Sequence, residues 1–124
     1  MKLAQTRVLA DDYESVFRFY RDVLGLRRGF GDETTGFAEF HAGDGVIAVF
    51  ERSEQAEAAP LARPADTALI ALAVGDVDAE AVRLGDHVVA GPLDRQDWAL
   101  RVAYLRDPAG MLIELHQPIV QEQP

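Results

Sequence analysis

Residues 98–116, WALRVAYLRDPAGMLIELH, are typical of two strands joined by a tight turn. The segment Asp107-Pro108-Ala109-Gly110 has type I turn chemistry, because Asp suits the first position, Pro presets φ at the second and Gly suits the fourth. Side chains alternate between the two faces of a strand. One face of the incoming strand is expected to carry Trp98, Leu100, Val102 and Tyr104, and one face of the outgoing strand Leu112, Glu114 and His116.

The carboxylate of Glu114 is the first candidate for a functional group, because it stands among apolar neighbours. A carboxylate in such surroundings is costly unless it meets water, a cation or a hydrogen-bond donor, and a fully buried Glu is rare. Arg101 or Arg106 could satisfy it locally as an ion pair. Alternatively, Glu114 and His116 face a binding site together.

Composition limits the class of protein. The 124 residues, 48% of them hydrophobic, are enough for one domain with a core. The formal net charge of −9 disfavours nucleic acid and anionic membranes as partners. No apolar run has the length of a membrane span, and the start of the chain lacks secretory-signal features. With no cysteine for disulfides or thiolate sites, we expect a cytoplasmic protein.

The order of predicted elements repeats once along the chain. Strands are expected at about 3–10, 26–31, 36–42 and 45–51, with a helix over 12–24 that begins at Asp11 with Glu14 completing a capping box. Residues 53–65 have the composition of a linker. After it come a strand at 68–74, a helix over 79–84 capped by Asp76 or Asp78 and ended by Gly85, and strands at about 87–90, 99–105 and 111–116. The prediction is a single α+β domain, residues 1–124, built from two βαβββ modules at about 1–52 and 66–120.

Several motifs carry a resemblance to a known family. They are FYRDVLGL at 19–26, VGDVD at 74–78, Gly91-Pro92, Trp98 and RDPAGMLIEL at 106–115. In this order and spacing they resemble the vicinal oxygen chelate superfamily, which includes glyoxalase I, the bleomycin resistance proteins and the extradiol dioxygenases. The resemblance implies curved mixed sheets around a cleft, a homodimer, and a small molecule bound in the cleft, in the enzymes through a divalent metal.

The resemblance also implies where such a metal would be held. The matching positions are Gln5, Ala48, Leu69 and Glu114, and alanine and leucine cannot coordinate a metal. Catalytic metals usually take three protein ligands. The expectation is therefore a site without a cofactor. The alternative is a divalent metal held weakly by Gln5 and Glu114.

Without a metal, the resemblance leaves an aromatic-lined pocket. Its candidate residues are Gln5, Phe37, Phe50, Leu69, Trp98, Val102, Tyr104, Leu112, Glu114 and His116. Two functions stay open. One is a metal-free protein similar to the bleomycin resistance proteins, which sequesters a drug or metabolite. The other is a lyase, isomerase or dioxygenase that uses a reduced metal site, or Glu114 as a general base whose pKa is raised by apolar surroundings. The count of metal ligands favours the binding protein.

Overall fold

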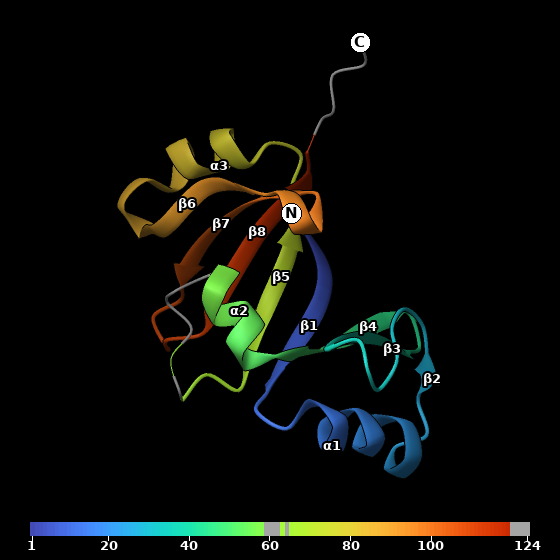
Figure 1. Ribbon diagram of the computed structural model, residues 1–124. Helices are drawn as coiled ribbons and strands as arrows, with labels where there is room; N and C mark the ends of the chain where they lie inside the picture. Colours follow the sequence, from blue (N-terminus) through green and yellow to red (C-terminus); the bar gives the residue numbers. More distant parts are fainter. Residues whose placement is uncertain (59–62, 64, 120–124) are drawn as a thin grey trace.

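The structure is a computed structural model that describes residues 1–58, 63 and 65–119. Within these ranges, eight strands form one curved mixed sheet (Figure 1) in the order β2-β3-β4-β1-β5-β8-β7-β6. The strands are β1 Lys2–Ala10, β2 Arg27–Arg28, β3 Phe37–Ala42, β4 Gly45–Glu51, β5 Ala68–Ala73, β6 Val88–Arg95, β7 Leu100–Arg106 and β8 Leu112–Pro118. The helices are α1 Tyr13–Arg18, α2 Arg52–Ala58 and α3 Val77–Leu84, with a π-helical turn η1 Phe19–Val23 and 3-10 turns η2 Gly85–His87 and η3 Gln96–Trp98.

The repeat expected from the sequence is present in the sheet. In each half the first strand runs parallel to the last, β1 beside β4 and β5 beside β8. The two halves join through the antiparallel pair of β1 and β5. The α+β fold of two βαβββ units is thus confirmed. Two strands differ in length from the prediction, since β2 has only two residues and β6 continues to Arg95.

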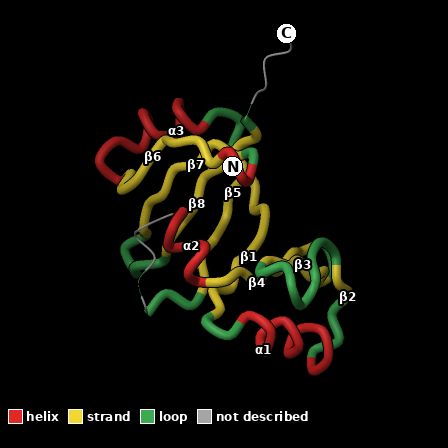
Figure 2. The backbone as a smooth tube through the Cα atoms, viewed as in Figure 1, coloured by secondary structure: helices red, strands yellow, loops and turns green. Residues whose placement is uncertain are grey.

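The helices divide between the two faces of the sheet. Phe17 of α1 packs with Phe40 and Val49, whose side chains lie on the convex face. Val77 of α3 is fully buried in the other half. Residues 53–58 of the predicted linker instead belong to α2, which begins at Arg52 (Figure 2). Residues 59–62 and 64 of the linker lie outside the described ranges. Because Gln55 of α2 bonds to a side chain of the concave face, α2 covers part of that face.

The helix ends follow ordinary capping chemistry. Asp12, rather than the predicted Asp11, caps α1 by accepting a hydrogen bond from the backbone N–H of Ser15. Asp76 caps α3, and Gly85 ends it with a φ of 56°. In the described part of the chain, no helix is long and apolar enough to cross a membrane.

Strand register decides which side chains meet on the concave face. Pairing places Gln5 opposite Ala71, Ala71 opposite Glu114, and Glu114 opposite Tyr104. The adjacent row across β4, β1, β5 and β8 consists of Ala48, Arg7, Leu69 and Leu112. Paired residues in neighbouring strands point to the same face. Glu114 and Arg7, which are 107 residues apart in the sequence, therefore lie side by side.

Candidate functional site

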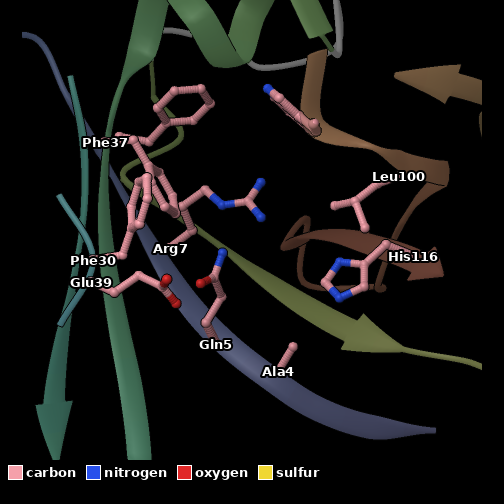
Figure 3. Close-up of a pocket in the computed structure, with 10 residues that line it drawn as sticks. Ala4, Gln5, Arg7, Phe30, Phe37, Glu39, Leu100 and His116 are labelled. Atoms are coloured by element: carbon pink, nitrogen blue, oxygen red, sulfur yellow. The ribbon is translucent and has the colours of Figure 1, made fainter. Parts of the chain in front are cut away.

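A cavity of about 490 Å³ opens on the concave face between the two modules (Figure 3). This volume lies within the range of small-molecule sites. Strands and loops from both halves contribute to its walls. The lining residues are Ala4, Gln5, Arg7, Phe30, Phe37, Glu39, Phe50, Trp98, Leu100 and His116.

One wall of the cavity is a row of aromatic rings. The ring centroids of Phe30 and Phe37 lie 6.0 Å apart, and those of Phe37 and Phe50 lie 5.4 Å apart in an edge-to-face arrangement. Phe50 then meets Trp98 at 5.8 Å, again edge to face. Trp98 comes from η3 in the second half, so this contact joins the two modules across the cavity.

The floor of the cavity is a buried ion pair. Both terminal nitrogens of Arg7 donate to Glu114, one to each carboxylate oxygen, at 3.0 Å. Arg7 is 4% exposed and Glu114 is not exposed at all. The hydroxyl of Tyr104 donates to Oε1 of Glu114 at 2.7 Å, and Nδ1 of His116 lies 3.0 Å from Oε2. The carboxylate is therefore enclosed by partners from three strands.

Arg7 has further partners that fix its remaining N–H groups. Nη1 also donates to Oε1 of Gln55 at 2.9 Å. In the amide orientation that satisfies its neighbours, Gln5 accepts from Nε and Nη2 of Arg7 at 3.0 and 2.8 Å. The guanidinium carbon lies 5.6 Å from the centroid of the Trp98 ring. All five N–H groups of Arg7 are thus engaged within the protein.

The electrostatics of Glu114 correct the expectation of a general base. Burial by itself raises the pKa of a carboxyl group, but the charge of Arg7 and the hydrogen bonds from His116, Arg7 and Tyr104 outweigh it. The pKa of Glu114 is accordingly lowered, to about 2, instead of raised. Burial and the neighbouring Glu114 charge both raise the pKa of Tyr104. A carboxylate so strongly held in its ionised form is a poor proton acceptor at neutral pH.

The predicted site residues separate into two layers. Five of them line the cavity: Gln5, Phe37, Phe50, Trp98 and His116. The other five are fully buried beneath it: Leu69, Val102, Tyr104, Leu112 and Glu114. Leu69, Val102 and Leu112 are core residues and do not line the cavity. Tyr104 also lies in this core and supports the ion pair through its bond to Glu114.

The predicted local partners of Glu114 were wrong. Arg101 instead bonds to Asp78 and Asp94. Arg106 bonds to Asp66, and this hydrogen bond is the main cause that lowers the pKa of Asp66, to about 2. Sequence proximity suggested these arginines, whereas the β1–β5–β8 pairing delivers Arg7.

Sequence reasoning missed Arg7, Phe30, Glu39 and Gln55. Alternation could have found two of them, because Arg7 follows Gln5 by two residues and Glu39 follows Phe37 by two residues. Phe30 lies outside any strand, and Gln55 lies in the segment taken as a linker. No local pattern marked either of these residues.

The side chains present do not fit the metal set of the resembled enzymes. Ala48 and Leu69 offer no donor atom, and both oxygens of Glu114 are bonded to Arg7. Among the described residues, no group of three or more His, Cys, Asp and Glu side chains is placed to hold a metal ion. A guanidinium group stands next to the carboxylate where a divalent cation would be needed.

The chain is similar in sequence to known proteins. The profile of the Glyoxalase/Bleomycin resistance protein/Dioxygenase superfamily matches residues 2–115. The uncharacterized protein YraH of Bacillus subtilis strain 168 is 32% identical over 126 residues, with 94% of this chain and 98% of that protein covered.

Solved structures of other proteins share this fold. A glyoxalase/bleomycin resistance protein/dioxygenase superfamily member from Vibrio splendidus 12B01 has a TM-score of 0.69 at 16% identity, with 91% of this chain and 96% of that chain covered. Methylmalonyl-CoA epimerase from Streptomyces coelicolor has a TM-score of 0.66 at 23% identity, with 100% and 99% covered.

Proposed function

Since this chain belongs to the Glyoxalase/Bleomycin resistance protein/Dioxygenase superfamily, we propose that it binds a small organic molecule on its concave face. In this proposal the protein sequesters a drug or metabolite without a metal cofactor. The observation that carries it is the 490 Å³ cavity with a row of aromatic rings and a few polar groups. Such a lining is typical of small-molecule sites.

The aromatic wall supports binding because part of it is not needed for the core. Phe30 is 65% exposed although it lines the cavity. A large exposed ring next to other rings is apolar surface that a flat ligand would remove from water. The polar groups of Gln5, Glu39 and His116 would then orient that ligand.

The enzyme alternative has less support from the geometry. Two of the four metal positions lack donors, and Glu114 is held ionised and buried by Arg7. A metal site with fewer protein ligands, or Glu114 acting as a base, would each require the ion pair of Arg7 and Glu114 to be broken. Because the geometry supports neither a metal site nor Glu114 as a general base, it favours binding over catalysis.

The test uses calorimetry with a library of flat aromatic drugs and metabolites, starting with antibiotics. For a ligand that binds, Trp98→Ala is expected to weaken binding by about 1–3 kcal/mol, the scale of an aromatic anchor. Val82→Ala is the control, because Val82 is an exposed apolar side chain on α3 that neither lines the cavity nor belongs to the dimer surface proposed below. An equal effect of both variants, or none from Trp98→Ala, would place the ligand elsewhere.

The proposal also includes a homodimer that works in the cytoplasm. Exposed apolar side chains of the α1 end, Phe19, Val23 and Leu24, are available for a partner copy. Light scattering during size-exclusion chromatography should give twice the chain mass of 13.6 kDa. The monomer mass at micromolar concentration would remove the dimer from the proposal.

A further inference from the structure

Glu39 is a carboxylate that lines the cavity and has no cationic partner among the described residues. It lies in β3, two residues after Phe37, and lines the cavity beside Phe30. Figure 3 shows its carboxylate directed toward Gln5. The Gln5 amide, in its satisfied orientation, donates to Glu39 at 3.3 Å. Within the described ranges, Glu39 forms no ion pair with Lys, Arg or His.

The other charged groups at the cavity offset each other. Arg7 is paired bidentately with Glu114, and its remaining N–H groups bond to Gln55 and Gln5. Arg7 thus has no N–H left to give to an anionic ligand. Among the Arg, Lys, Asp and Glu side chains that line or underlie the cavity in the described part of the chain, Glu39 supplies the one negative charge that is not balanced there.

The aromatic wall suits the same kind of ligand. The face of an aromatic ring attracts cations, and this attraction strengthens when the cation is shielded from water. The wall already holds two cations at its Trp98 end. The Arg7 guanidinium lies 5.6 Å from the Trp98 centroid and 6.0 Å from that of Phe50, and the Arg95 guanidinium lies 4.9 Å from the Trp98 centroid. The Phe30 and Phe37 end of the wall adjoins Glu39 (Figure 3), and no Lys or Arg of the described residues lies over either ring.

We propose that the ligand of this cavity is an organic cation, an amine on a flat apolar body. Its ammonium group bonds to Glu39, and its body packs against Phe30 and Phe37. This proposal rests on the proposed binding function and names the class of ligand. The net charge of −9 adds long-range attraction for cations and raises their encounter rate.

The test compares three probes with one ring system and different charge: 2-naphthylmethylamine, 2-naphthalenemethanol and 2-naphthoic acid. Calorimetry should show the amine binding about tenfold more tightly than the alcohol, as for a hydrogen bond to a charged group, and the acid most weakly. Glu39→Gln should remove the preference for the amine and leave the alcohol affinity unchanged. Glu54→Gln, which removes the same charge from an exposed position on α2, should change neither. Far-UV circular dichroism establishes that each variant is folded.

The outcomes separate the two proposals. If the alcohol or the acid binds as tightly as the amine, the cation proposal fails and the binding function stands. The same holds if Glu39→Gln keeps the preference for the amine, or if Glu39→Gln and Glu54→Gln weaken it equally. If none of the three probes binds, both proposals fail for this cavity.

Discussion

Replacing Glu114 with Gln should destabilise the protein strongly, because the change leaves Arg7 as a buried charge without a counter-charge. Removing one partner of a buried ion pair typically costs about 3–5 kcal/mol. The pKa of Glu114 points in the same direction, because it is lowered in the folded protein and folding therefore favours the ionised carboxylate. We therefore expect a loss of about 3–5 kcal/mol in the free energy of unfolding.

The assay is urea denaturation followed by Trp98 fluorescence and far-UV circular dichroism. Arg7→Met should be as destabilising as Glu114→Gln, since it leaves the carboxylate unpaired. The double variant should recover part of the loss, because neither charge is then stranded. Asp78→Asn is the matched control, since it breaks an exposed pair with Arg101 and should cost far less stability than either of these single variants.

The opposite pattern would refute this reasoning. A loss below about 1 kcal/mol for Glu114→Gln, together with lost ligand binding, would identify Glu114 as a group that contacts the ligand. Equal and additive losses in the double variant would show that Arg7 and Glu114 do not depend on each other.

Three further predictions follow from the same structure. The free energy of unfolding should fall as pH drops from about 4.5 toward 2. The pKa values of Glu114 and Asp66 are lower in the folded state than in the unfolded state, so protonation favours unfolding. Urea midpoints across this pH range measure the loss, and a flat profile would contradict it. Calorimetric titration with Ni²⁺, Zn²⁺, Mn²⁺ or Fe²⁺ should show no micromolar binding, whereas stoichiometric binding lost in Gln5→Ala would overturn the metal-free site. Gly91→Ala should lower the melting temperature, because φ at Gly91 is 82° and a Cβ would lie 2.6 Å from the carbonyl oxygen of Val102; an unchanged melting temperature would show that the backbone adapts.

The elements of the fold were predictable because their signals are local. Alternation along 100–106 and 112–116, the Asp-Pro-Ala-Gly turn and the Asp76 cap of α3 act within a few residues and are present in the structure. The strand predicted to include Trp98 and Ala99 begins only at Leu100, because Trp98 lies in η3 and Ala99 has a left-handed φ of 55°. The α2 helix was missed because its short polar and alanine-rich segment has no apolar stripe. Its position is fixed by Gln55, which bonds to Arg7 in a distant strand.

The cavity lining was only partly predictable, since alternation gives the face of a side chain but not its depth. Phe37 and Phe50 line the cavity as expected. Leu69 and Val102 point to the same face yet lie in the core, because neighbouring strands and side chains cover them. The depth at which a side chain is buried depends on the curvature of the sheet and on the residues that pack over it. The sequence of a single strand predicts neither of these.

The sequence by itself determined the two βαβββ units, the aromatic content of the site and the isolation of Glu114 among apolar residues. Only the tertiary structure decided what Glu114 does. The β1–β5–β8 pairing brings Arg7 beside Glu114 across 107 residues of sequence. A carboxylate that was expected to act on a ligand is therefore held in an ion pair beneath the cavity. Long-range strand register sets that partnership, because a shift of one residue would turn Arg7 to the opposite face of the sheet.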